Sequence, residues 1–437
     1  MDTTIFTERE SNVRSYCRSF PDVFHFAKGA QVQGEAGKTY IDFFAGAGAL
    51  NYGHNNEYIK RKIISYIEQD GIIQGLDMYT VAKRAFLEKF CHTILAPRDL
   101  DYKVMFCGPT GTNAVESALK LARKVKGRSG IFSFMGGYHG LSLGSLAATS
   151  NAGHRAGAGL ALDNVTFLPY PFGFMSQFDT IAYLESILTD SHSGIDKPAA
   201  ILFETVQAEG GVVVAPIEWM QRLREVCDRH DILLICDDIQ VGCGRVGSFF
   251  SFERAHILPD MVTLSKSISG YGLPMSLLLH KPEHDVWKPA EHTGTFRGNQ
   301  LAFVGATAAI ELFEELRLDQ VVKEHEKYLQ QFLASEIAPL HPHISIRGIG
   351  MIWGIDFSLM GGPRLAKAVA TYCFEHGLII EITGRNDTVL KILPPLVIDA
   401  PLLQKGCAII KEAIQACLLQ PANGRWQAHA PTVSPIA

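Results

Sequence analysis

The central part of the chain, from about residue 103 to residue 315, alternates short apolar runs with longer stretches of helical period. Helical spacing is clearest over residues 111–126, where alanines recur on one stripe, and a second helical stretch covers residues 217–230. Between such stretches lie apolar runs of strand length: Lys103–Phe106, Ile131–Phe134, Ala200–Phe203, Leu233–Cys236 and Met261–Leu264. Strands that alternate with helices predict an α/β fold with a mostly parallel sheet that helices cover on both faces.

The two ends of the chain predict a second, smaller α/β unit. Residues 31–42 read as two short strands around a Gly-bounded turn. After residue 315 the sequence predicts a polar helix over residues 320–337 and a strand region over residues 344–357. A second helix, over residues 364–376, and a short strand, over residues 378–382, follow. We therefore expect residues 1–60 and 317–420 to form the small domain and residues 61–316 to form the large domain. Residues 421–437 would form a tail. The tail holds three prolines and no apolar period, so we expect it to be disordered.

Composition excludes several classes of function. The 437 residues carry a net charge of −5 and no polybasic run, which argues against nucleic acid or an anionic membrane surface as a partner. The polar N-terminus shows no signal peptide, and apolar runs such as Ile232–Cys236 are too short to span a bilayer. Nine cysteines are scattered without a CxxC pair or a Cys/His cluster, which favours reduced thiols in a cytoplasm over disulfides or a metal site.

Polar or glycine-rich residues follow several of the apolar runs, at the strand ends where parallel α/β sheets build their sites. The turn Cys107–Asn113 lies between a strand and a helix, and free backbone N–H groups at a helix N-terminus bind anions such as phosphate. Gly111 lets an anion approach the backbone, and Thr112 can donate a hydroxyl hydrogen bond. The simpler alternative is a tight turn in which a threonine caps the helix.

Asp237 and Lys266 each follow an apolar run, and each is a residue type that is unfavourable to bury alone. The protonated ring nitrogen of a cofactor is one partner for a buried carboxylate. A partly buried lysine has a lowered pKa, which Schiff-base chemistry requires. Taken singly, a solvated strand end for Asp237 and a surface position for Lys266 are the commoner cases. Tyr138, soon after the run that ends at Phe134, can stack on a flat ligand or cap the core.

A competing motif, Gly242–Gly247, matches the GxGxxG fingerprint of dinucleotide-binding proteins. That fingerprint normally forms the strand–helix turn itself and opens a helix. Here residues 237–241 intervene after the strand, and the following stretch Ser248–Phe252 does not begin an amphipathic helix. A nucleotide-dependent dehydrogenase is therefore the weaker alternative.

These strand-end sites, in this order, resemble the class III (ω-amino acid) aminotransferases of fold type I, which use pyridoxal 5′-phosphate (PLP). The resemblance runs from about Lys38 to Leu396, and its most specific part is the run Leu234–Gly247 followed by Lys266. In the family, an Asp-Glu-Val-Gln-x-Gly-x-Gly-Arg-x-Gly run precedes the Schiff-base lysine at this spacing (266 − 237 = 29). The resemblance implies a large domain with a seven-stranded sheet, a small domain built from both chain ends, amino and keto acids as substrates, and a homodimer or a dimer of dimers.

Most of the family's functional residues have a matching position in this sequence. The resemblance implies that Lys266 holds PLP as a Schiff base and then moves the substrate proton, while Asp237 keeps the pyridine nitrogen protonated. Further cofactor contacts that it implies are Gly111 and Thr112 at the phosphate, Tyr138 and Ile239 on the two ring faces, Gln240 near the ring hydroxyl, and Thr295 at the phosphate of the neighbouring subunit. Implied substrate contacts are Glu204, Glu209 and Lys391.

Segments such as Asn12–Arg18 and Phe43–His54 resemble more closely the L-2,4-diaminobutyrate:2-oxoglutarate 4-aminotransferases of ectoine biosynthesis. This implies glutamate as the amino donor and aspartate 4-semialdehyde as the acceptor. Three positions depart from the wider family: Asn113 replaces a glutamate, Leu141 replaces an arginine that binds the distal carboxylate, and Lys391 replaces the arginine before Pro-Pro-Leu. The alternatives are another ω-aminotransferase, acting on ornithine, lysine, 4-aminobutyrate or a β-amino acid, and a PLP-binding regulatory protein without turnover.

Overall fold

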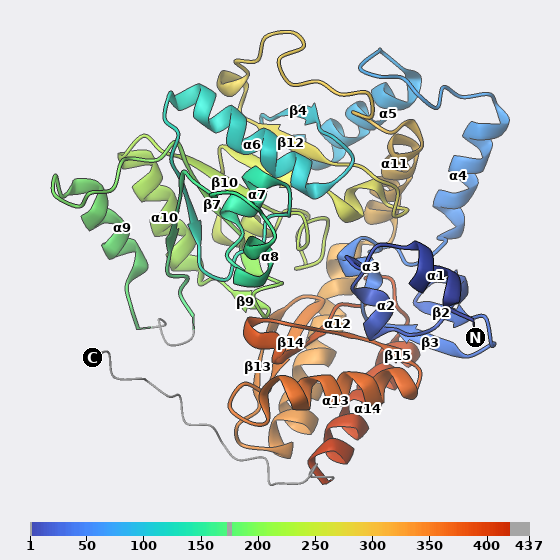
Figure 1. Ribbon diagram of the computed structural model, residues 1–437. Coiled ribbons are helices and arrows are strands. Elements are labelled where there is room, and N and C mark those ends of the chain that lie inside the picture. Colours follow the sequence, from blue (N-terminus) through green and yellow to red (C-terminus); the bar gives the residue numbers. More distant parts are fainter. Residues whose placement is uncertain (1, 173–176, 420–437) are drawn as a thin grey trace.

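The computed structural model of the chain describes residues 2–172 and 177–419, which form a large and a small α/β part (Figure 1). The predicted tail, 421–437, lies outside the described residues. None of the helices in the described ranges is both long and apolar enough to cross a membrane.

Seven strands form the sheet of the large part, as predicted. In spatial order they are β4 (Lys103–Phe106), β12 (Leu277–His280), β11 (Met261–Leu264), β10 (Leu233–Asp237), β7 (Ala200–Phe203), β5 (Ile131–Phe134) and β6 (Val165–Leu168). The pairs from β11 to β6 are parallel, and β12 runs antiparallel to both of its neighbours. The prediction of a mostly parallel sheet is confirmed, and the five apolar runs between residues 103 and 264 that the sequence predicts as strands are strands.

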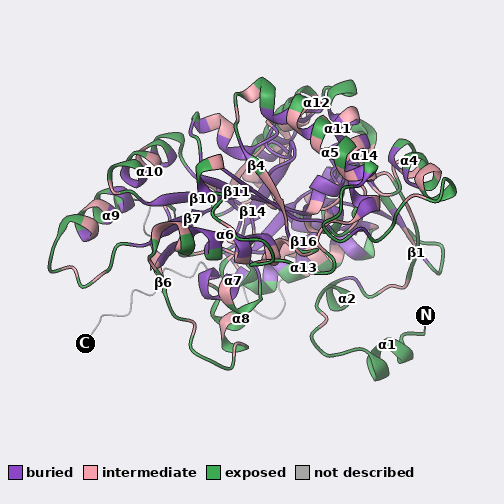
Figure 2. Cartoon of the chain, turned by 90° about the horizontal axis from the view of Figure 1, so that it is seen from above, coloured by how far each residue is buried: buried purple, intermediate pink, exposed green. Residues whose placement is uncertain are grey.

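The large sheet is buried on both faces because successive side chains along a strand pack into two different apolar cores, one on each face. On β10, Leu233 belongs to the core that includes α6 (Gly111–Lys126), whereas Leu234 belongs to the core that includes α10 (Ile217–Arg229). A continuous apolar run is the expected sequence of a strand that is covered on both faces. Buried residues accordingly fill the sheet and the helix faces next to it (Figure 2).

The large part contains further helices that begin at side-chain caps. Asn56, Thr80 and Asn299 accept hydrogen bonds from the first N–H groups of α4, α5 and α11, which fixes where these helices start. The bounds of the remaining elements are α3 (Ala45–Gly48), α4 (Glu57–Glu68), α5 (Val81–Phe90), α7 (Leu143–Ala148), α8 (Ala152–Ala156), α9 (Thr180–Thr189), α11 (Gln300–Glu315), β8 (Val206–Gln207) and β9 (Val213–Val214).

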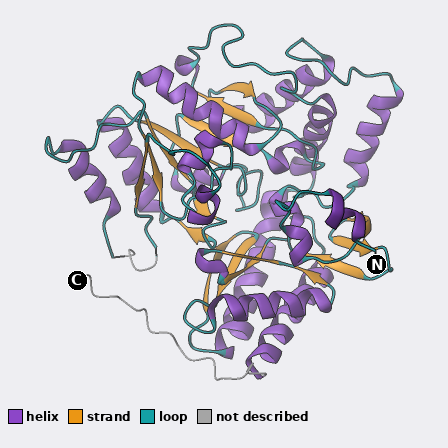
Figure 3. Cartoon of the chain, in the orientation of Figure 1, coloured by secondary structure: helices purple, strands orange, loops and turns teal. Residues whose placement is uncertain are grey.

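Both ends of the chain build the small part, as predicted (Figure 1), and this part contains both helices and strands (Figure 3). One sheet has the order β1 (Phe24–Lys28), β2 (Gln31–Gly34), β3 (Thr39–Asp42) and β15 (Leu378–Ile379), so its parallel β3–β15 pair joins the two chain ends. A second sheet has the order β13 (Ser345–Ile349), β14 (Ile352–Asp356), β17 (Val389–Ile392) and β16 (Glu381–Thr383). The helices of the chain ends are α1 (Thr4–Arg9), α2 (Tyr16–Ser19), α12 (Leu318–Phe332), α13 (Gly362–Glu375) and α14 (Ala400–Leu419). The domain boundaries at residues 60, 316 and 420 stay predictions.

Two strand predictions in the small part need correction. The region 344–357 is an antiparallel hairpin and not one strand, because Gly350, with a φ of 56°, turns the chain between β13 and β14. The run 378–382 is divided between β15 and β16, which belong to different sheets. This division places Glu381 directly opposite Lys391 in the β16–β17 pair.

Candidate active site

Four segments bring polar side chains to one edge of the large sheet. Asp237 is the last residue of β10, and Lys266 follows shortly after the end of β11. Glu204 directly follows β7, and Tyr138 lies in the turn after β5. Because these strands are parallel neighbours, their carboxyl ends meet at the same edge, where α/β folds build their sites.

The Asp237 carboxylate is buried, with 5% of the residue exposed. Its Oδ2 lies 2.7 Å from Nδ1 of His139, and its Oδ1 accepts hydrogen bonds from Oγ1 of Thr263 at 3.0 Å and from the N–H of Ile239 at 3.3 Å. Among the described residues, neither a lysine nor an arginine forms an ion pair with it. Each carboxylate oxygen has two lone pairs, so Asp237 can still accept from one protonated ligand nitrogen. Sequence reasoning missed His139 and Thr263, although His139 stands next to Tyr138 in the turn that was singled out.

Lys266 begins a short 3-10 helix (Lys266–Ser269) with a φ of 52°, in the left-handed region that non-glycine residues rarely adopt. Such backbone strain costs on the order of 1–3 kcal/mol and occurs mainly at functional sites. The hydroxyl of Ser267 donates to the carbonyl of Gly48 at 2.7 Å, which ties this turn to the N-terminal region. Burial lowers the pKa of Lys266, while the charge of Glu209 opposes that change. A lysine with a lowered pKa supplies a neutral amine, which is the reactive form.

The N-terminus of α6 opens onto the same edge. Gly111 is its first residue, and a Cβ added there would lie 3.0 Å from Cδ1 of Ile239, so only glycine fits without a shift. The Thr112 hydroxyl lies 2.6 Å from the hydroxyl of Ser142. Backbone N–H groups of the first helical turn, a glycine and two hydroxyls together make an arrangement that suits a phosphate. Thr110 is the N-cap residue, so the capping alternative and the phosphate prediction are compatible.

Lys391 is fully buried on β17 and lies between two carboxylates. Its Nζ is 2.6 Å from Oε1 of Glu209 and 2.8 Å from Oε1 of Glu381, and it donates to Oε1 of Gln240 at 3.3 Å. Burial alone would raise the pKa of Glu209, but the charges of Lys391 and Lys266 lower it to about 2. Sequence reasoning missed Glu381, because its contact with Lys391 depends on a strand register that no local pattern reveals.

Tyr138, Glu204 and Thr295 lie in different surroundings. The buried carboxylate of Glu204 accepts a hydrogen bond from the backbone N–H of Tyr138 at 3.2 Å, so it supports the aromatic residue. Burial, and then the charge of Asp237, raise the pKa of Glu204 well above its usual range. Thr295 is exposed, and its carbonyl accepts a hydrogen bond from Gln74 at 3.1 Å. A substrate contact of Glu204 and a phosphate contact of Thr295 stay predictions.

The competing GxGxxG segment, Gly242–Gly247, forms a series of turns after β10 and does not open a helix of the α type. Its Arg245 is fully buried and donates hydrogen bonds to the side chain of Asn51 and to the carbonyls of Met351 and Pro394. These contacts join the large part to the small part. The geometry is not the strand–turn–helix unit of a dinucleotide fingerprint.

Comparison with known families agrees with this geometry. The family described as aminotransferase class-III matches residues 18–414, which is most of the chain. The chain belongs to the class III aminotransferases. Enzymes of this class use PLP, so the dehydrogenase alternative is wrong.

Relatives of this class III aminotransferase match it along almost their whole length. It is 52% identical over 427 residues to the diaminobutyrate--2-oxoglutarate transaminase of Bordetella parapertussis, covering 97% of this chain and 98% of the relative. The transaminase of the same name from Wolinella succinogenes is 53% identical over 412 residues, with 94% and 95% covered. Among solved structures, the ornithine aminotransferase from Toxoplasma gondii matches with a TM-score of 0.82 at 25% identity, over 94% of this chain and 93% of that one.

The residues at the sheet edge of this class III aminotransferase fit PLP. Asp237 offers a buried carboxylate to a protonated ring nitrogen, and its existing partners are His139, Thr263 and a backbone N–H. The N-terminus of α6 suits the phosphate, and Gly111 keeps that approach open. Lys266 would supply the amine that reacts with the aldehyde group of PLP. When bound, PLP supplies the electron sink for transamination.

Proposed function

We propose that this enzyme transfers the amino group of L-glutamate to L-aspartate 4-semialdehyde, giving L-2,4-diaminobutyrate and 2-oxoglutarate. The proposal rests on the 52% and 53% identity to two diaminobutyrate--2-oxoglutarate transaminases, over 97% and 94% of this chain. The reaction has two halves. One half converts glutamate to 2-oxoglutarate, and the other half converts the semialdehyde to diaminobutyrate.

In this proposal the residues at the sheet edge have two tasks, to hold the cofactor and to move a proton. Lys266 holds the cofactor between reactions, and its released amine carries the proton to and from the reacting carbon of the substrate. Its lowered pKa supports this role, because a neutral amine can accept a proton. The residues that hold the cofactor are Gly111 and Thr112 at the phosphate, Asp237 at the ring nitrogen, Tyr138 and Ile239 at the ring faces, and Gln240 near the ring hydroxyl.

The two substrates differ in what they bring beside the cofactor ring. Glutamate reacts at its α-carbon, so its α-carboxylate must lie there, whereas diaminobutyrate reacts at its terminal amine and brings no carboxylate to that place. The enzyme therefore needs a cation that one substrate uses and that is masked for the other. Lys391 is such a cation, because its ion pair with Glu209, at 2.6 Å, masks it. Moving Glu209 away would free Lys391 for the carboxylate of glutamate.

Single-turnover half-reactions of the PLP-loaded enzyme test the proposed substrates. The amines to compare are L-glutamate, L-2,4-diaminobutyrate, L-ornithine, L-lysine, 4-aminobutyrate and β-alanine. We expect glutamate and diaminobutyrate to react fastest, and the diaminobutyrate product to be aspartate 4-semialdehyde. A 2-oxo acid that retains the terminal amine would contradict the proposal. Faster reaction with ornithine or another amine than with diaminobutyrate would favour the alternative ω-aminotransferase.

We further propose a homodimer in which Thr295 of one chain contacts the phosphate held by the other chain. The region around Thr295 leaves large apolar side chains on the surface of the single chain: Ile72, Ile73, Met78, Tyr79 and Phe296. The hydrogen bond from Gln74 to the Thr295 carbonyl connects the two segments that carry them. An exposed apolar surface of this kind supports burial against a second copy.

Mixed dimers test the contribution of Thr295 from the neighbouring chain. Lys266→Ala should be inactive, and Thr295→Ala should bind PLP about tenfold more weakly, because one hydrogen bond to a charged group is lost. In a mixed dimer of the two variants, the chain that retains Lys266 receives the intact Thr295 of the other chain. We therefore expect mixing to restore activity at limiting PLP. No restoration, or a fully active monomer in sedimentation experiments, would contradict the proposal.

A cytoplasmic location and a role in ectoine biosynthesis are also proposals. The location is supported by buried cysteines that are present as thiols, among them Cys107, Cys227 and Cys236, because an oxidising compartment favours disulfides. The pathway follows only from the subfamily that the sequence resembles.

A further inference from the structure

Lys391, the cation of the proposed dual-substrate step, has a second carboxylate partner. Oε1 of Glu381 lies 2.8 Å from Nζ of Lys391. The two residues are directly opposite each other in the antiparallel β16–β17 pair, so the strand register itself brings them together. Both are buried, with 8% of Glu381 and 0% of Lys391 exposed. The masking of Lys391 by Glu209 does not account for this second carboxylate.

The two glutamates differ in how else they are held. Glu209 also accepts hydrogen bonds from Gln240 at 3.1 Å and from Thr383 at 3.2 Å. Oε1 of Glu381, apart from its contact with the ammonium of Lys391, has no hydrogen-bond partner within the described ranges. A buried carboxylate with one partner must either keep that partner or take up a proton. Glu381 is therefore more dependent on Lys391 than Glu209 is.

One ammonium group cannot neutralise two carboxylates. When Glu209 and Glu381 are both ionised, the cluster with Lys391 carries a net charge of about −1, which repels the carboxylate of a substrate. When Glu381 is protonated, the cluster is neutral, and Lys391 becomes available as soon as Glu209 moves away. The protonation state of Glu381 thus decides how strongly the cluster resists a substrate carboxylate.

We propose that Glu381 is a specificity-determining residue, which competes with the α-carboxylate of the amino donor for Lys391 and releases the cation when it takes up a proton. The inference rests on the proposed function, because only a substrate that reacts at an α-carbon brings a carboxylate to Lys391. The reacting end of diaminobutyrate has no carboxylate and does not meet this competition. Glu381 therefore sets the balance between the two half-reactions and makes it depend on pH.

Charged groups inside the site fix the direction of this dependence. Burial raises the pKa of Glu381 to about 7, against the opposing charge of Lys391, while Glu209 adds to the rise and Lys266 opposes it. Tyr16 of α2 is half-exposed and lies near the same cluster, where partial desolvation, followed by the charges of Glu381 and Glu209, raises its pKa to about 12, so Tyr16 stays neutral. Glu381 is consequently protonated below about neutral pH and ionised above it.

Elements that pack against β16 from outside the site add little charge. Helix α13 buries an apolar face, with Cys373 as its buried titratable group, and burial raises the pKa of that thiol so that it stays neutral. The turn that follows β16 carries Arg385 and Asp387, which are both exposed to solvent. Exposed charges of opposite sign have weak effects on a buried group because water screens them. Lys391 and Glu209 therefore dominate the charge around Glu381.

Binding of glutarate, an unreactive dicarboxylate, tests the competition without turnover. Calorimetric titration of the PLP-loaded enzyme measures the Kd of glutarate from about pH 6 to about pH 8.5, on both sides of the titration of Glu381. For the wild type we expect Kd to rise about tenfold over this range as Glu381 becomes ionised. In Glu381→Gln, which keeps the size but not the charge, this rise should be lost. At the upper pH the variant should bind glutarate about tenfold more tightly than the wild type does.

Glu336→Gln is the matched control, because Glu336 forms an ion pair with Lys411, at 2.6 Å, on the surface. It should keep the pH dependence of the wild type. The same pH dependence in Glu381→Gln as in the wild type would overturn the proposal. A wild-type Kd that does not change with pH would also overturn it, and that result does not require any variant to fold.

A kinetic measurement separates this inference from the proposed function. The ratio of kcat/KM for glutamate to kcat/KM for diaminobutyrate cancels ionisations that both half-reactions share. We expect the ratio to fall as pH rises in the wild type and to stay level in Glu381→Gln. If diaminobutyrate does not react but glutarate binding behaves as expected, the proposed function fails and the role of Glu381 stands. If diaminobutyrate reacts and glutarate binding is unchanged in the variant, only the role of Glu381 fails.

Discussion

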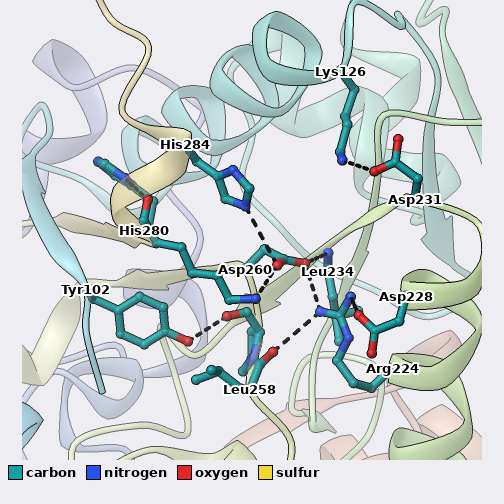
Figure 4. Close-up of polar contacts among 12 residues, drawn as sticks. Tyr102, Lys126, Arg224, Asp228, Asp231, Leu234, Leu258, Asp260, His280 and His284 are labelled. Carbon is teal, nitrogen blue, oxygen red and sulfur yellow. Dashed lines mark hydrogen bonds and ion pairs between the residues drawn. The ribbon is translucent and has the colours of Figure 1, made fainter. Parts of the chain in front are cut away.

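Asp237 and Asp260 are equally buried carboxylates, both 5% exposed, which lie at the ends of neighbouring strands and at opposite edges of the same sheet. Asp237 ends β10 at the edge where the site residues gather, whereas Asp260 directly precedes β11 at the other edge. Arg224 and His284 lie beside Asp260 (Figure 4), with Nη1 of Arg224 at 2.8 Å and Nε2 of His284 at 3.7 Å from the carboxylate. Nζ of Lys281 lies 2.7 Å from the same carboxylate. The backbone N–H of Leu234 donates to the same carboxylate at 2.8 Å.

This difference shows which carboxylate is available to a ligand. Burial would raise the pKa of Asp260, but the nearby side chain of His284, the charge of Arg224 and the hydrogen bonds from Leu234 and Lys281 hold it well below its usual range. The charge of Asp260 is therefore compensated within the protein. Asp237 depends on His139, Thr263 and a backbone N–H, and a protonated ring nitrogen would complete its surroundings. We infer that Asp260 stabilises the fold and that Asp237 is prepared for the cofactor.

The largest effect on activity should come from Lys266→Ala, at the edge that carries Asp237. We expect a loss of turnover of more than about a thousandfold, because both the nucleophilic amine and the proton carrier are removed. The thermal midpoint should stay close to that of the wild type, and PLP should still bind non-covalently. Single-turnover kinetics and calorimetry measure the two properties. Residual transamination comparable with that of the wild type would contradict the role of Lys266.

Asp260→Asn is the corresponding change at the opposite edge, and here stability should be lost and activity retained. We expect the free energy of unfolding to fall by about 3 kcal/mol, because Arg224 and Lys281 lose their shared carboxylate. Urea unfolding measures the change, and kcat per folded molecule should stay within about twofold of the wild type. A large loss of kcat without a loss of stability would break the distinction between the two edges.

A pH series sharpens the same test. The pKa of Asp260 in the folded chain lies below its value in the unfolded chain, which is about 4. The stability that this carboxylate contributes is fully present above the unfolded pKa and is lost as pH falls towards the folded pKa. Between about pH 5 and pH 2, the free energy of unfolding should therefore fall more steeply for the wild type than for Asp260→Asn. Equal slopes would show that Asp260 is not compensated as the structure indicates.

Lys391→Ala should separate the two half-reactions by a smaller factor. The α-carboxylate of glutamate would lose a charge-assisted contact of about 1.5–3 kcal/mol, or roughly ten- to a hundredfold in the glutamate half-reaction. The diaminobutyrate half-reaction should change much less. Lys391→Arg keeps the charge and should retain most of the glutamate rate. Equal losses in both half-reactions would show that Lys391 acts only on the structure, by neutralising Glu209 and Glu381.

The sequence could predict Asp237 and Lys266 because a charged residue after an apolar run is a local pattern, and a family motif fixes the spacing between them. The partners of Asp237 could not be predicted in this way. His139 lies 98 residues away in the chain, and Thr263 faces Asp237 only through the register of β10 and β11. Glu381 was missed for the same reason. The hairpin at Gly350 was missed because apolar residues continue on both sides of the turn.

The smallest effect, and the finest test of the comparison, should come from Thr263→Val. Thr263 is the register partner of Asp237, and its hydroxyl donates to Oδ1 at 3.0 Å in a fully buried position. Valine has nearly the same shape but no donor, so the variant removes one hydrogen bond while His139 and the backbone N–H of Ile239 remain. A hydrogen bond of about 1 kcal/mol corresponds to roughly fivefold weaker PLP binding, measured by fluorescence titration, with kcat at saturating PLP within about twofold of the wild type. Thr307→Val is the matched control, because that hydroxyl donates to the carbonyl of Phe303 within its own helix, and PLP affinity should not change. If Thr263→Val loses stability but keeps its PLP affinity, Asp237 is compensated within the protein as Asp260 is, and the distinction between the two carboxylates fails.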